Sequence, residues 1–196
     1  MKKAGIRWLC IAVAAVVALV AAAGLFVTLD RRVIVDGKLY PKGQAVLDLR
    51  GTELKAESYD KLVKKLPGST VLWDVPFQGT TYPSFTEELT VSTLSSEDEA
   101  QLSYFPQLKI LDGTDCQDYE TLSKAFRDYP NCQVVYSVPI DGVDYPSTAK
   151  TVTLENLTQE DVGMLSYLPE LETVDGSGCA DYLLLQQLQQ DRTDLT

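Results

Sequence analysis

The sequence has no histidine among its 196 residues. Because histidine is the commonest general base and a frequent zinc ligand, its absence excludes the usual hydrolase triads and most zinc sites. Basic residues are scarce in the distal part: from Gly68 onward, five lysines and arginines face 22 aspartates and glutamates. A surface of that charge repels nucleic acid and anionic lipid, so neither is an expected ligand of this part.

Cysteine is also rare, with four residues in the chain. Cys116 and Cys132 allow two interpretations. A disulfide between them would close a loop of about 17 residues and contribute roughly 3 kcal/mol in the chain-entropy model. Alternatively, Cys116 is a buried thiol that packs as a small apolar side chain and forms a weak hydrogen bond. The sequence leaves both open.

The remaining candidates for chemistry are carboxylates. Adjacent acidic pairs stand at 97–98 and 160–161, each after hydroxyl residues, and we interpret them as helix N-terminal caps rather than as acid–base pairs. The aspartates around Cys116 lack the alternating spacing of a calcium loop. We therefore predict no enzymatic activity, no metal and no cofactor.

The N-terminus carries one long uncharged run, from Trp8 to Leu29. Its 22 residues would make a helix of about 33 Å, close to the thickness of a bilayer core. We predict a cytoplasmic segment at 1–7, kept inside by its basic residues, and a transmembrane anchor at 8–29. The alternative is a cleaved signal peptide, since Ala21-Ala22-Ala23 offers an A-x-A site. Either interpretation places residues 30–196 outside the cytoplasm.

The rest of the chain repeats itself. Residues 67–128, the first copy, match residues 130–191, the second copy, at 24 positions with an offset of 63. Such self-similarity is typical of arrays of supersecondary units, which usually present a binding surface.

A β-hairpin signal occurs three times, once before the two copies and once near the start of each copy. Turns at Asp36-Gly37, Gln78-Gly79 and Asp141-Gly142 stand between β-rich runs, and glycine favours the positive φ that a tight hairpin needs. Short strands are expected after the hairpins, at 46–49, 89–91 and 152–154, and helices after Ser95 and Thr158. We place a juxtamembrane strand and hairpin at 30–45 and the repeat domain at 46–196.

The spacing of apolar residues around the cysteines resembles the leucine-rich repeat family, specifically irregular repeats on surface proteins of Gram-positive bacteria. Leu108, Leu111 and Cys116 fall on the family pattern, as do their equivalents 63 residues later. Two features depart from it, because Gly113 and Gly176 occupy a position where the family prefers leucine and because the hairpins are additional. The resemblance implies an α/β leucine-rich-repeat-like solenoid with inserted β-hairpins, preceded by one transmembrane helix.

From these observations we expect a membrane-anchored, extracytoplasmic and non-catalytic binding module for protein or peptide partners. The expected binding side chains are the equivalent aromatic pairs, Trp73 with Tyr136 and Tyr82 with Tyr145, since tyrosine and tryptophan are favoured at interfaces. The alternative is a structural, self-associating component of a cell-envelope assembly. The sequence does not determine the oligomeric state.

Overall fold

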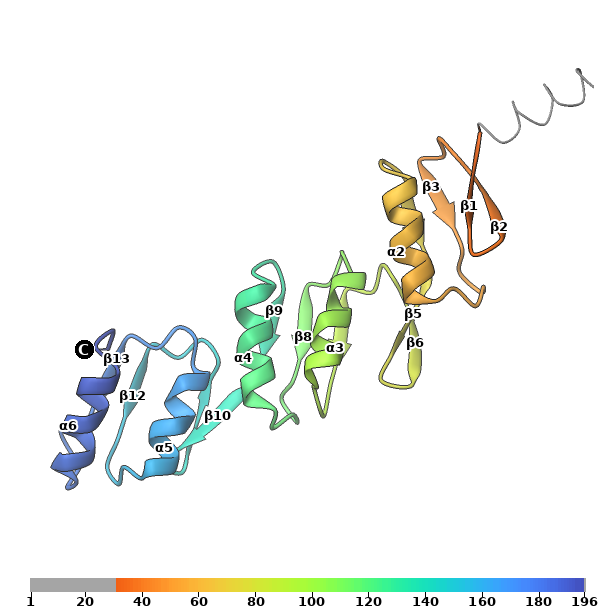
Figure 1. Cartoon of the computed structure of the whole chain (residues 1–196). Helices are drawn as coiled ribbons and strands as arrows, with labels where there is room; N and C mark the ends of the chain where they lie inside the picture. Colours follow the sequence, from red (N-terminus) through yellow and green to blue (C-terminus); the bar gives the residue numbers. More distant parts are fainter. Residues whose placement is uncertain (1–30, 196) are drawn as a thin grey trace, which may run out of the picture. The chain divides into compact units, whose positions relative to one another are not determined.

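The computed structural model describes residues 31–195 and divides them into two compact units, 31–74 and 75–195. Figure 1 shows their strands and helices in chain order. Within residues 31–195, no helix is both long enough and apolar enough to cross a membrane. The predicted anchor at 8–29 lies outside the described residues.

The first unit combines a hairpin with a parallel strand pair. Its elements are β1 (Arg32–Val35), β2 (Lys38–Pro41), β3 (Val46–Asp48), α2 (Ala56–Lys65) and β4 (Thr70–Leu72). Strands β1 and β2 are antiparallel, whereas β3 and β4 are parallel and joined through α2. Asp36 and Gly37 have φ values of 48° and 79°, so both central turn residues are left-handed, as in the turn that matches the twist of a hairpin.

This unit has a core of its own. Alternate residues of β1 point inward, so that Val33 and Val35 are buried while Ile34 is exposed. Residues from every other element of the unit complete the cluster: Tyr40, Leu47, Leu62, Leu66 and Val71. One α-helix over two short sheets is therefore enough to bury a continuous apolar group.

The second unit contains the remaining elements in the same alternation of hairpins, short parallel strands and helices. They are β5 (Asp74–Phe77), which begins at the unit boundary, β6 (Thr80–Pro83), β7 (Glu88–Thr90), α3 (Ser96–Gln101), the 3₁₀ turn η1 (Leu102–Tyr104), β8 (Ile110–Asp112), α4 (Tyr119–Asp128), β9 (Gln133–Val135), β10 (Ser137–Ile140), β11 (Val143–Pro146), β12 (Thr151–Thr153), α5 (Gln159–Met164), the 3₁₀ turn η2 (Leu165–Tyr167), β13 (Thr173–Asp175) and α6 (Tyr182–Asp191). The three predicted hairpins are confirmed as β1-β2, β5-β6 and β10-β11.

The predicted solenoid is wrong. A leucine-rich-repeat solenoid has one parallel sheet that runs through all repeats. Here the parallel strands form three separate sheets, β3-β4, β7-β8-β9 and β12-β13, with a two-stranded hairpin between successive sheets in the chain. The resulting fold is a set of small sheets with five α-helices among residues 31–195.

Ser147 provides a physical reason for the break between β9 and β12. Its amide donates to the carbonyl of Tyr136 at 2.8 Å, and its hydroxyl donates to the carbonyl of Val134 at 3.0 Å. On the opposite edge of β9, the carbonyl of Val135 accepts from Gly113 of the β8 side at 2.8 Å. Because Ser147 bonds the carbonyls on the far edge of β9, β12 has no free edge to join there. Ser84, at the equivalent position of the first copy, is also buried.

Candidate functional site

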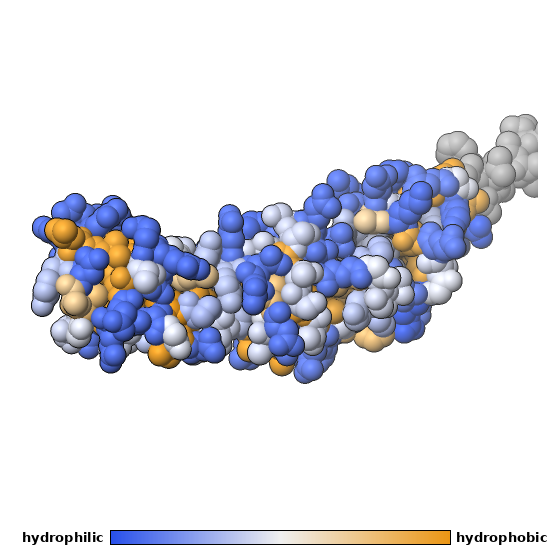
Figure 2. Space-filling view, turned by 90° about the horizontal axis from the view of Figure 1, so that it is seen from below, coloured by the Kyte–Doolittle hydropathy of each residue, from blue (hydrophilic) through white to orange (hydrophobic). Residues whose placement is uncertain are grey.

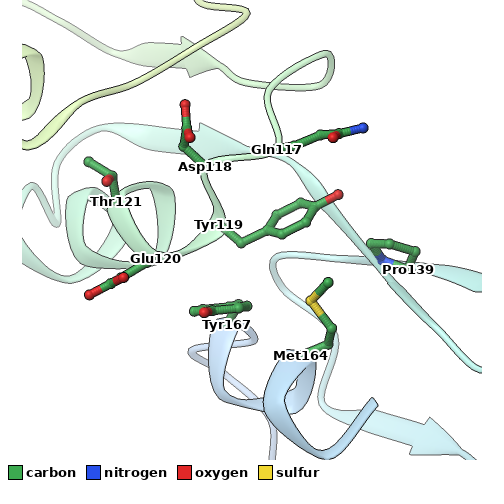
Figure 3. Close-up of a pocket in the computed structure, with 8 residues that line it drawn as sticks. All are labelled: Gln117, Asp118, Tyr119, Glu120, Thr121, Pro139, Met164 and Tyr167. Carbon is green, nitrogen blue, oxygen red and sulfur yellow. The ribbon is translucent and has the colours of Figure 1, made fainter. Parts of the chain in front are cut away.

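A hollow of about 520 Å³ opens in the second unit between the start of α4, strand β10 and the end of α5 with η2. Four side chains face it from these elements: Tyr119, Pro139, Met164 and Tyr167. Figure 3 shows the Tyr119 ring extending toward Pro139, with Met164 and Tyr167 on the other side of the same space. The hollow is therefore lined by the start of a helix from the first copy and by a hairpin strand and the end of a helix from the second copy.

Two aromatic rings define the apolar side of the hollow. The centroids of Tyr119 and Tyr167 are 6.0 Å apart, and their planes are inclined by 32°. Both side chains are half-buried, so each presents part of its ring to solvent. Burial, with smaller contributions from Asp144 and Cys116, raises the pKa of Tyr119 above its ordinary value.

The wall on the α4 side is acidic and polar. Asp118 and Glu120 flank Tyr119, and Gln117 and Thr121 complete the lining. Figure 3 shows the Asp118 carboxylate directed away from Met164 and Tyr167. Its Oδ2 accepts from the backbone amide of Leu94 at 2.7 Å and from the Cys116 thiol at 3.7 Å. Asp118 therefore fixes the start of α4, while Glu120 is exposed and adds negative charge at the rim.

Tyr136 ties this site to the core. Its ring is buried, and its hydroxyl donates to the carbonyl of Tyr167 at 2.7 Å. Burial raises the pKa of Tyr136. The hydrogen bond places η2, and with it the Tyr167 ring, beside the start of α4.

Of the four aromatic residues expected to form a binding surface, Trp73 and Tyr136 are buried, whereas Tyr82 and Tyr145 are half-buried. Trp73 is fully buried in the first unit and stacks on Tyr59 with centroids 4.7 Å apart. Tyr82 lies edge-on to Phe77 and Phe105 at 6.3 and 6.5 Å.

The hydroxyl of Tyr145 donates to the carbonyl of Thr153 at 3.0 Å. None of the four predicted residues lines the hollow, and Tyr136 donates a hydrogen bond to Tyr167, which does. In the sequence, Tyr119 is the first of three apolar residues spaced as on one face of a helix, with Leu122 and Phe126. This spacing does not show which aromatic side chain lies opposite Tyr119.

The cysteines of the described residues, Cys116, Cys132 and Cys179, are free thiols. Cys116 is buried, and burial raises the pKa of its thiol. In this structure Cys116 is a thiol that makes the weak hydrogen bond to Asp118 described above. The Cys116–Cys132 disulfide stays a prediction. Among residues 31–195, no group of three or more acidic or cysteine side chains could hold a metal ion.

No protein-family model, curated protein or solved structure matches the chain.

Proposed function

We propose that this chain is a non-catalytic binding module for a protein or peptide partner, and that the hollow at Tyr119 and Tyr167 receives an apolar or aromatic side chain of that partner. The observation that carries the proposal is the pair of half-exposed tyrosine rings, which face Pro139 and Met164 across an open space. Such rings offer a large contact area at a small cost in conformational entropy.

The negative charge of this part of the chain favours a partner with basic residues. The chain from Gly68 onward has 22 acidic and five basic side chains, and the exposed Glu120 stands at the rim of the hollow. We therefore favour a partner segment that carries lysine or arginine next to the inserted side chain, because opposite charges accelerate association and orient the partner. In the same proposal residues 8–29 anchor the chain in the membrane, and residues 30–196 are extracytoplasmic.

The test uses a displayed library of random 12-residue peptides that is selected on the full-length chain. We expect enrichment of peptides in which an aromatic or aliphatic residue neighbours lysine or arginine. Tyr167→Ala should weaken the selected peptides by about tenfold or more, since truncating an aromatic anchor costs more than about 1 kcal/mol.

The matched control is Tyr104→Ala, which changes the equivalent tyrosine of the first copy, outside the hollow. It should leave the affinity of the selected peptides unchanged. Equal enrichment on the wild-type chain and on the Tyr167→Ala variant would contradict the proposal.

A further inference from the structure

The first unit has one end that is purely basic. This end is formed by the start of β1, the loop from β2 to β3, and the end of α2 with the loop to β4. Figure 1 shows the starts of β1 and β3 and the end of α2 at the same end of the unit. Among the described residues of these segments no side chain is acidic, and five are basic and exposed: Arg31, Arg32, Lys42, Lys64 and Lys65. We call these five residues the basic end; Asp30, which precedes them, lies outside the described residues.

The opposite end of the unit carries charges of both signs. A hollow of about 350 Å³ at the hairpin turn and the start of α2 is lined by Asp36, Glu53 and Glu57 together with lysines. Lys61 pairs there with Asp36 at 2.7 Å. Positive charge at this end is thus balanced by nearby carboxylates, whereas the segments of the basic end supply none.

The basic end contains a hollow of about 430 Å³, which Lys42 lines from the β2–β3 loop and Lys65 from the end of α2. The hydroxyl of Ser69 donates to the carbonyl of Gln44 at 2.6 Å and so joins the two loops that form its walls. Lys65 Nζ donates to the carbonyl of Ile34 at 2.7 Å. Because an ammonium group has three donors, Lys65 keeps donors for a ligand. Two ammonium groups on a fixed frame suit a phosphate, which offers several acceptor oxygens.

Helix stability explains only part of this charge. Lys64 and Lys65 stand in the last turn of α2, where cations suit the negative end of the helix dipole. Arg31, Arg32 and Lys42 lie outside the helix, so the dipole does not account for them. Their location at the same end therefore points to an anion from outside the chain.

The position of the basic end in the chain favours a membrane as the source of that anion. Arg31 follows the last residue of the proposed anchor, Leu29, by two residues, which span at most about 7 Å. Charges interact over about 8 Å at physiological ionic strength, so the headgroups would lie within reach of this end. On the face of the first unit that Figure 2 shows, hydrophobic side chains are scattered among hydrophilic ones. We therefore expect contact with headgroups and not insertion into the hydrocarbon.

We propose that the basic end of the first unit binds the headgroups of anionic phospholipids, and that the hollow between Lys42 and Lys65 receives a lipid phosphate. The inference rests on the membrane anchor of the proposed function and is independent of the Tyr119–Tyr167 hollow. Each lysine or arginine near an anionic surface favours the contact by about fivefold. The contact would hold the first unit against the membrane by this end.

The test uses the full-length chain in nanodiscs, made either of phosphatidylcholine alone or with about one-third phosphatidylglycerol. Hydrogen exchange with mass spectrometry follows both loops of the basic end. In the anionic nanodiscs we expect exchange in 42–45 and 66–69 to be at least about threefold slower than in the neutral ones. The difference should disappear in about 1 M sodium chloride, where charges interact over only about 3 Å.

Paired substitutions locate the contact. Lys42→Gln with Lys65→Gln should abolish most of the slowing, since two charges near the surface change the contact equilibrium by about 30-fold. Lys42→Gln with Lys64→Gln should do the same while the bond from Lys65 to Ile34 is kept. The matched control removes two exposed lysines from the opposite end, Lys38→Gln with Lys55→Gln. It should behave like the wild-type chain.

Equal exchange in neutral and anionic nanodiscs would overturn the proposal, as would an equal loss of slowing in the control variant. Inorganic phosphate that slowed exchange to the same extent in neutral nanodiscs would overturn the choice of a lipid as the ligand. Failure of the anchor is recognised separately, because the chain would then not stay with neutral nanodiscs. Sedimentation of that chain with anionic vesicles, lost in the Lys42→Gln and Lys65→Gln variant, would still support headgroup binding.

Discussion

Gly113 and Gly176 show how a single missing Cβ atom can decide local packing. A Cβ at Gly113 would lie 2.6 Å from Cδ2 of Leu122, and one at Gly176 would lie 2.6 Å from Cδ2 of Leu185. In each copy the leucine of the following helix occupies the space that a larger residue would need. The packing of these leucines explains why neither position holds a residue larger than glycine.

The two glycines should respond differently to substitution. Gly113→Ala is expected to cost about 1–3 kcal/mol, because Leu122 is fully buried and has no space to move into. Gly176→Ala should cost less than about 1 kcal/mol, since Leu185 is partly exposed and can change rotamer. Urea denaturation of the two variants measures the difference. An equal decrease in the free energy of unfolding for the two variants would mean that Leu185 is held as tightly as Leu122.

At the scale of elements, α3 and α5 begin with the same capping box. The hydroxyl of Thr158 accepts from the Asp161 amide at 3.2 Å, and the Asp161 carboxylate accepts from the Thr158 amide at 2.9 Å. Ser95 and Asp98 make the equivalent pair of bonds in the first copy. Asp161 also accepts from the amide of Asp141 at 2.8 Å, which joins the hairpin turn to the helix.

Asp161→Asn should therefore destabilise the fold in a pH-dependent way. Burial opposes ionisation of Asp161, but hydrogen bonds from Asp141 and Thr158 outweigh it and hold its pKa below the usual 3.8. A carboxyl with a lowered folded-state pKa stabilises above its unfolded pKa, and the contribution is lost as the pH falls through the folded value. We expect a cost of about 1 kcal/mol at pH 7, in the range of lost caps.

Urea unfolding at pH 7, 5 and 3 measures this dependence. The difference between wild type and Asp161→Asn should be similar at pH 7 and 5 and smaller at pH 3. Asp115→Asn is the control, because Asp115 is exposed and the second copy has glycine there. A difference that stayed constant down to pH 3 would contradict the role of the charge.

The elements themselves could be predicted, because their signals are local. Asp141-Gly142 specifies a hairpin through two adjacent φ values of 50° and 75°, and Thr158 specifies a helix start through a contact three residues away. The separation of β9 from β12 could not be predicted, since it depends on the hydrogen bonds of Ser147 to the carbonyls of Val134 and Tyr136. The hollow depends likewise on Tyr119 meeting Tyr167, and periodicity does not reveal that contact.

At the scale of the molecule, the chain has two units that differ in charge and in core. Residues 31–67 carry nine lysines and arginines against five acidic residues, in contrast to the acidic chain that follows. The core cluster of the first unit comprises residues between Val33 and Val71 only. The first unit thus has an apolar core cluster made of its own residues.

Separate cores predict separable effects of core substitutions. Leu62→Ala and Leu122→Ala each remove a side chain that is 0 % exposed, at an expected cost of about 2–5 kcal/mol. Hydrogen exchange with mass spectrometry should show Leu62→Ala lowering protection in 31–74 while 75–195 keep theirs. Leu122→Ala should lower protection in 75–195 and leave that of 31–74 unchanged. Loss of protection in both units from either substitution would show that the units unfold together.

One extended segment serves two sheets in succession, and this restricts how its length can vary. From Gln133 to Ile140, exposed and buried residues alternate without interruption through β9, Tyr136 and β10. A strand turns each successive side chain to the opposite face, so inserting one residue at Tyr136 would reverse the faces of every residue on one side of the insertion. Two inserted residues would preserve them. We therefore expect this junction to tolerate insertions or deletions of an even number of residues only, because an odd number would exchange the buried and exposed faces of the strand.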